Sequence, residues 1–214
     1  MPSKTTIYIY ARSIASSYVG LQNGKVRDWE LLKDIYDKGM ETPPNWVATP
    51  AGDNVKAIQE GKWLRKDGTP GGTTSEGLGI AWCGIFATYV LQGAGLPVKW
   101  RKGTGITPLS PYLELCSYNM SNEIEPGDIC VKGTNQHHFV VHNRNGDTLY
   151  SYDGNLPGQS IGERSYNIAD MKEAAKQADV EMAQKKKTMS EAEFKSYIQT
   201  HSKYNFYFYR LRKA

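Results

Sequence analysis

The stretch "AWCGIFATYVLQGAG", residues 81–95, predicts the helix around which this chain folds. Residues 81–92 are apolar at most positions, as expected of a helix that is buried on most sides. Gly93 and Gly95 indicate where the helix ends. Cys83 stands at its start, where alanine or valine would serve a core equally well. Because the helix dipole and free N–H groups favour a thiolate at an N-terminus, Cys83 is a candidate nucleophile.

The composition predicts a soluble globular protein with one domain over residues 1–214. The chain has 214 residues, of which 39% are hydrophobic, and a net charge of +4. This charge is too weak and too dispersed to indicate nucleic-acid binding. No apolar run approaches the roughly 18 residues of a membrane span, so we expect no transmembrane segment. The three cysteines form no CxxC motif, and we expect neither a bound metal nor a cofactor.

Helical and strand patterns alternate along the chain and predict an α+β fold. The expected segments are a strand-like start and a helix over 5–22, an amphipathic helix over 27–38, a short helix over 54–63, a loop over 66–79, a turn over 125–128 that leads into a strand, a hairpin over 138–155, a polar helical pair over 168–201 and a closing strand over 204–211. The helical pair contains a capping box, formed by Ser190 and Glu193, at the start of its second helix.

The hairpin predicts which polar side chains meet. If the Asn-Gly pair at 145–146 occupies the centre of a type I′ turn, His138 stands directly opposite Asp153. Directly opposed residues share a face of the sheet, with Cβ atoms roughly 4.5–5.5 Å apart. Asn155 follows one diagonal step further on that face, whereas His137 points to the other face. We therefore expect His138 to be oriented by Asp153 or Asn155.

These residues supply the parts of a nucleophilic site. Cys83 would attack, His138 would act as general base, and Asp153 or Asn155 would hold the imidazole. Backbone N–H groups beside Cys83 could stabilise an oxyanion.

Four motifs in this order resemble the papain-like amidohydrolases of the CHAP and NlpC type, which are cell-wall enzymes. They are "WCGIFATYVLQGAG", "EPGDICV", "HHFVVH" and "YDGN", and they lie within about residues 80–156. The resemblance implies a papain-like fold and the same roles for Cys83, His138 and Asp153 or Asn155. The sequence departs from the family pattern in its doubled histidine and in Asp153, where glutamate is commoner. No upstream oxyanion side chain is recognisable in "TTSEGLGIA", residues 73–81, and the helical pair is additional.

The resemblance implies a cysteine amidase or endopeptidase that cleaves peptidoglycan at the stem peptide. The N-terminus lacks the apolar core of a secretory signal peptide, so we expect synthesis in the cytoplasm. One setting is a type VI secretion effector, which a contractile machine delivers to the periplasm of rival cells and which a cognate immunity protein blocks. A phage endolysin fits nearly as well. Two further functions stay open: a papain-like acyltransferase or deamidase that acts on a protein or lipid, and a non-enzymatic module that binds glycan or a partner.

Several more residues admit simpler interpretations. Trp82 and Trp100 could line a substrate groove, although aromatic residues more often belong to a core. Cys116 and Cys130 are expected to be packing residues. His142 is expected to be structural, and Asp128 is expected to cap the turn before its strand.

Overall fold

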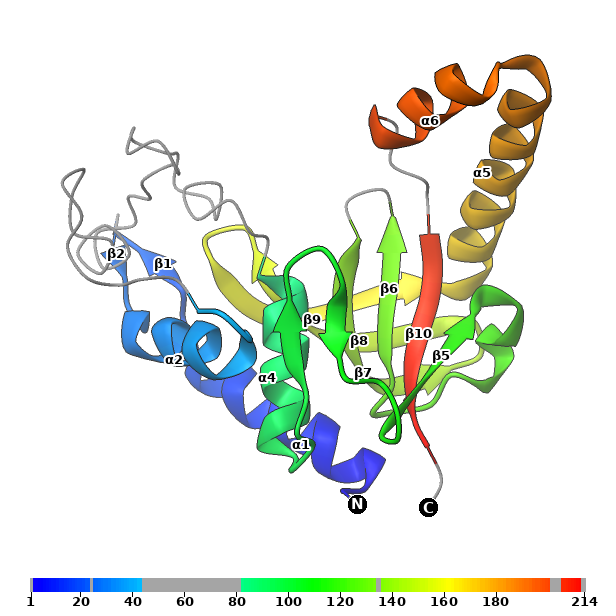
Figure 1. Ribbon diagram of the computed structural model, residues 1–214. Coiled ribbons are helices and arrows are strands. Elements are labelled where there is room, and N and C mark those ends of the chain that lie inside the picture. The colour runs from blue at the N-terminus through cyan, green and yellow to red at the C-terminus, as the bar shows by residue number, and fades with distance from the viewer. Residues whose placement is uncertain (1, 24, 44–81, 134–135, 201–204, 213–214) are drawn as a thin grey trace, which may run out of the picture.

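The computed structural model describes residues 2–23, 25–43, 82–133, 136–200 and 205–212, which form a mixed α+β fold. The described strands build a six-stranded antiparallel sheet in the order β5-β10-β6-β7-β8-β9 (Figure 1). Their bounds are β5 Leu113–Ser117, β6 Ile129–Gly133, β7 His137–Asn145, β8 Thr148–Leu156, β9 Ser160–Asn167 and β10 Asn205–Leu211. The closing strand β10 lies between the edge strand β5 and β6, so it occupies an inner position of the sheet.

Short elements complete the described part. Two small hairpins join β1 (Leu21–Gln22) to β2 (Lys25–Val26) and β3 (Lys99–Arg101) to β4 (Gly105–Thr107). A 3₁₀ helix, η2, covers Tyr118–Glu123.

The helices α1 (Lys4–Ser17) and α4 (Cys83–Gly93) pack on one face of the sheet, and α2 (Trp29–Gly39) packs against α4 (Figure 1). The helix α4 contacts α1, α2, β7 and β8, and every residue from Cys83 to Leu91 is buried. This central position explains its apolar composition. The predicted strand-like start of the chain is wrong, because α1 is helical from Lys4. The Ser3 side chain caps α1 by accepting a hydrogen bond from the Thr6 N–H.

The helical pair before the closing strand is confirmed as α5 (Ile168–Thr188) and α6 (Glu191–Thr200). The first turns of α5 bury Ile168, Met171 and Ala175 in the core on the second face of the sheet. The rest of α5 has no buried residue and extends away from the sheet, and α6 runs from the far end of α5 across towards the start of β10 (Figure 1). The capping box is also confirmed, since the Glu193 carboxylate accepts a hydrogen bond of 2.8 Å from the Ser190 N–H.

The hairpin of β7 and β8 is confirmed, but its predicted register is wrong. Asn145 pairs with Thr148, so the turn is centred one residue later than expected. A bulge between Val141 and Asn143 then shifts the register again. As a result, Asp153 stands opposite Phe139 and not opposite His138.

Several smaller predictions can be compared with the structure. Cys116 and Cys130 are buried, and they flank Phe208 on the two neighbouring strands. Asp128 caps its turn by accepting a hydrogen bond of 2.9 Å from the Glu125 N–H. The segments 54–63, 66–79 and 73–81 lie outside the described residues. In the described ranges, no helix is long and apolar enough to cross a membrane.

Candidate active site

Cys83 is the first residue of α4, and its side chain lies beside the beginning of β7. The residue is 3% exposed. The side chain of the N-cap residue, Trp82, makes no capping hydrogen bond, and the first N–H groups of a helix have no acceptor within it. Gly154 lets β8 approach α4 closely, since a Cβ there would lie 2.7 Å from the Phe86 Cβ. The glycine of the "YDGN" motif therefore has a packing role next to the site.

A buried carboxylate holds the imidazole of His137. The Nε2 atom of His137 lies 2.7 Å from Asp153 Oδ2. Asp153 is fully buried and also accepts hydrogen bonds from the Tyr166 hydroxyl and, at 2.5 Å, from the Ser151 hydroxyl. These contacts fix the carboxylate, which in turn fixes the imidazole ring. The carboxylate can only accept, so Nε2 of His137 carries the hydrogen and Nδ1 is the ring nitrogen left for another partner.

The two adjacent histidines lie on opposite faces of the sheet. His138 pairs with Val131 and points to the face covered by α4, whereas His137 points to the face that contains Phe139 and Asp153. Both rings lie at the beginning of β7, next to the start of α4. Both imidazoles therefore act on the Cys83 thiol and lower its pKa, one from each face of the sheet.

These contacts favour an ion pair between the thiol and an imidazole. Burial alone would raise the pKa of Cys83, but the hydrogen bonds and charges of His137 and His138 outweigh it and lower the pKa to about 6. Burial alone would lower the pKa of His137, but its hydrogen bonds to Asp153 and Cys83 raise that pKa to about 9. Between these values the site holds a thiolate beside an imidazolium, which is the form that attacks an electrophile.

Trp100 forms a wall of the site. It is half-buried, and its ring meets the ring of His138 edge to face, with centroids 4.9 Å apart at 86°. The same ring lies against Gly84, where a Cβ would overlap the indole. Gly84 is thus needed for the close approach of Trp100 to the first turn of α4. A substrate contact by Trp100 stays a prediction.

Two predicted site residues lie elsewhere. Trp82 is fully buried and donates a hydrogen bond of 3.0 Å to Gln159 Oε1, so a groove role for Trp82 is wrong. Asn155 sits where the register of β8 and β9 shifts, with φ of +60°. Within the part of the chain that the structure describes, no hydrogen bond joins Asn155 to either imidazole. Its residue type suits the left-handed backbone, which asparagine tolerates better than most residues.

Three residues of the site are not among those predicted from the sequence: His137, Ser151 and Tyr166. The pair of adjacent histidines is evident in the sequence. Which of the two shares a face with Asp153 depends on the bulge between Val141 and Asn143. Tyr166 comes from β9, which the predicted elements did not include. Ser151 precedes Asp153 by two residues and shares its face, so alternation along the strand could have found it.

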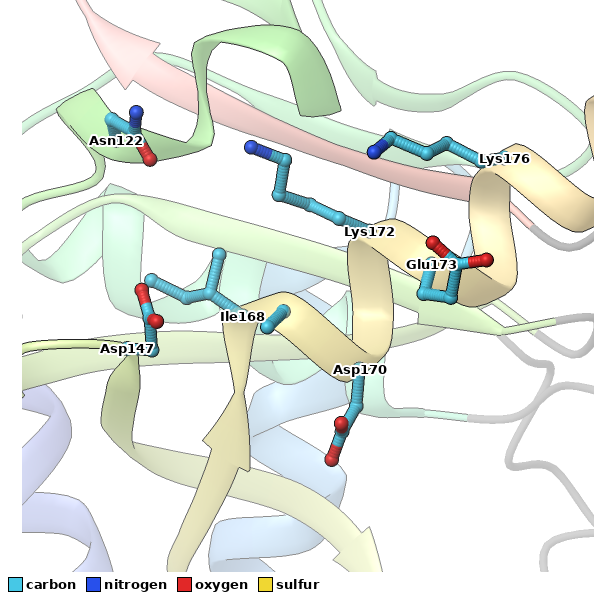
Figure 2. Close-up of a pocket in the computed structure, with 8 residues that line it drawn as sticks. Asn122, Asp147, Ile168, Asp170, Lys172, Glu173 and Lys176 are labelled. Atoms are coloured by element: carbon cyan, nitrogen blue, oxygen red, sulfur yellow. The ribbon is translucent and has the colours of Figure 1, made fainter.

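A pocket of about 500 Å³ lies at the start of α5, between that helix and η2. Figure 2 shows Lys172 and Lys176 one turn apart on α5, with Asn122 and Asp147 on the opposite side. None of its lining residues belongs to the candidate active site. Among the described residues, no group of three or more His, Cys, Asp or Glu side chains is arranged to hold a metal ion.

Comparison of the chain with protein-family models, with curated proteins and with solved structures gives no significant match in any of the three. The function is therefore inferred from the geometry of the site and from the resemblance of the four motifs.

Proposed function

We propose that this protein is a papain-like cysteine hydrolase that cleaves amide bonds in peptidoglycan. The observation that carries the proposal is the convergence of Cys83, His137 and Asp153, which together provide a nucleophile, a proton carrier and an orienting carboxylate. His137 replaces His138 as the expected general base, because Asp153 holds the former. The choice of peptidoglycan rests on the resemblance of the motifs to cell-wall amidohydrolases.

In the first half of the reaction, the Cys83 thiolate attacks the amide carbonyl and forms a C–S bond. The N–H groups of the first turn of α4 stabilise the oxyanion. The His137 imidazolium then gives its proton to the departing amine as the C–N bond breaks, and a thioester remains. In the second half, neutral His137 takes a proton from water, which attacks the thioester. The sulfur leaves as the thiolate, and the product is a carboxylate.

The biological setting is part of the proposal. A cell-wall hydrolase of this kind fits an antibacterial effector delivered to the periplasm of a rival cell, where an immunity protein of the producer would block the site. A phage endolysin has the same chemistry and differs only in its route to the wall.

The proposal is tested by digesting purified sacculi and analysing the released fragments by mass spectrometry. We expect fragments from the wild type and from Cys116→Ser, a control that changes a buried thiol outside the site. Cys83→Ser should release none, and the fragment masses identify the bond. Intact sacculi of several chemotypes with folded wild-type protein would contradict the proposal and favour acyl transfer or deamidation.

A further inference from the structure

A lysine stands directly opposite the proposed proton carrier in the sheet. Lys132 of β6 pairs with His137 of β7, so the two side chains share a face, with Cβ atoms roughly 4.5–5.5 Å apart. Neither side chain is closed off from solvent, since Lys132 is half-buried and the His137 side chain is 27% exposed. A molecule that reaches His137 from this face therefore comes close to Lys132.

An aromatic ring holds the ammonium of Lys132 in place. The Nζ atom lies 4.4 Å from the centroid of the Tyr166 ring, which is a cation–π contact. The hydroxyl of the same tyrosine donates to Asp153, the carboxylate that holds His137. Tyr166 thus contacts both the carboxylate behind the imidazole and the ammonium beside it.

The charge of Lys132 lacks a counter-ion in the described part of the chain. Within those ranges no carboxylate forms an ion pair with its ammonium. Asp153 is fully buried, and its carboxylate is already occupied by His137, Tyr166 and Ser151. An ammonium that a ring holds in place, and that no carboxylate neutralises, is suited to bind an anionic group of another molecule.

We propose that Lys132 binds a carboxylate of the substrate, on the side of the scissile amide that leaves as the amine. The inference rests on the proposed function, in which His137 gives its proton to the departing amine. Because Lys132 is opposite His137, the substrate atoms nearest to it belong to the departing fragment. The preferred substrates are then peptides in which the residue that supplies the nitrogen of the cleaved bond also carries a free carboxylate.

The test uses two synthetic stem peptides that contain the bond cut in sacculi and that differ only in this group, a carboxylate in one and a carboxamide in the other. We expect Lys132→Met to raise KM for the carboxylate peptide by about 10- to 100-fold, the contribution of a hydrogen bond to a charged group. KM for the carboxamide peptide and kcat should change little, and Lys132→Arg should keep most of the preference. Lys185→Met is the matched control, because Lys185 lies over the ring of Tyr197 on the helical pair, 5.6 Å from its centroid.

A second measurement needs no substrate. Iodoacetate and iodoacetamide both alkylate a thiolate, which displaces iodide as the C–S bond forms, and they differ only in a carboxylate against an amide. The ratio of the two rates at Cys83 therefore reports a nearby cation. We expect Lys132→Met to lower the ratio of iodoacetate to iodoacetamide by about 3- to 10-fold, because the charged reagent loses the attraction of the ammonium. Lys132→Arg and Lys185→Met should keep the ratio, and thermal unfolding checks that each variant is folded.

The outcomes distinguish this proposal from the proposed function. If the wild type cleaves the peptides, the carboxylate site is overturned by an unchanged KM in Lys132→Met or by an equal loss with both peptides, which would mean that Lys132 only supports Tyr166. Cleavage of sacculi only at bonds whose amine-side residue has no free carboxylate would overturn it as well. If folded wild type leaves sacculi intact, the proposed function is refuted. A ratio of alkylation rates that still falls in Lys132→Met would then keep the carboxylate site, and an unchanged ratio would overturn it too.

Discussion

The imidazole of His137 lies 2.7 Å from the carboxylate of Asp153, although the residue opposite Asp153 in the strand ladder is Phe139. His137 is two residues from Phe139 and shares its face, so the contact is a diagonal one between neighbouring strands. The proposed chemistry depends on this relationship and on the contacts that surround it.

Replacing the carboxylate should weaken the proton carrier. In Asp153→Asn the charge that stabilises the His137 imidazolium is lost, and we expect kcat/KM to fall by about 10²- to 10³-fold. The pKa of His137 is raised in the wild type, so activity that needs the imidazolium is lost as the pH rises through about 9. In Asp153→Asn this alkaline limb should move to lower pH. The pH dependence of hydrolysis measures the shift, and an unchanged alkaline limb would show that Asp153 does not support the imidazolium.

Removing one donor from the carboxylate should have a smaller effect. Tyr166→Phe deletes the hydroxyl that bonds Asp153, and we expect the free energy of unfolding to fall by about 1–3 kcal/mol. The expected loss in kcat/KM is about tenfold, since His137 and Asp153 remain. Tyr150→Phe is the matched control, because Tyr150 is exposed on the same hairpin. Denaturant unfolding and kinetics measure both variants, and equal effects of the two would argue against a supporting role for Tyr166.

The close contact between Gly84 and Trp100 predicts a coupled pair. The Cβ of Gly84→Ala would overlap the indole, and we expect a loss of about 1–3 kcal/mol in stability together with reduced turnover. In a Trp100→Ala background the same substitution should cost little, because the ring is gone. A double-mutant cycle on unfolding free energies measures the coupling. Additive effects would mean that the Trp100 ring does not rest on Gly84.

Trp82 and Trp100 should differ in what their substitution changes. Trp82→Phe removes the hydrogen bond to Gln159, and we expect it to lower stability by about 1–3 kcal/mol with KM unchanged, because Trp82 is fully buried. Trp100→Phe alters a half-buried wall beside His138 and should change kcat/KM at nearly constant stability. Steady-state kinetics and denaturant unfolding distinguish the effects of the two substitutions. A raised KM in Trp82→Phe would indicate that Trp82 contacts the substrate.

The sequence was sufficient to predict that Cys83 opens the central helix and that Asp153 meets a histidine of the hairpin. Cys83 was recognisable because a polar, reactive residue opens an otherwise apolar helix, and the structure places it at the start of α4. The two strands of the hairpin were recognisable from the Asn-Gly turn between them. The helical pair was recognisable from its polar helical pattern and from the capping box of Ser190 and Glu193. These features are local, and local patterns follow from a few neighbouring residues.

The choice between the two histidines could not be made from the sequence. Moving the turn by one residue would still have left Asp153 on the face of His138. The bulge between Val141 and Asn143 reverses the face, and with it the histidine that Asp153 reaches. A bulge is set by packing on both faces of a sheet, which no periodic pattern in a single strand contains. The hydrogen bond from Trp82 to Gln159 is likewise a contact between residues that are distant in sequence.

The most direct test of the proposed site is the pH at which Cys83 becomes reactive. Cys83 should be alkylated by iodoacetamide with an inflection near pH 6, far below the ordinary range of a thiol near 8.5. Cys116 and Cys130 serve as internal controls, because burial raises the pKa of each. Peptide mapping by mass spectrometry identifies the modified residue at each pH. Selective modification of Cys83 at pH 7, with a rate that falls only below about 6, is the predicted result. An inflection at or above 8.5 would contradict the thiolate–imidazolium pair on which the proposed function depends.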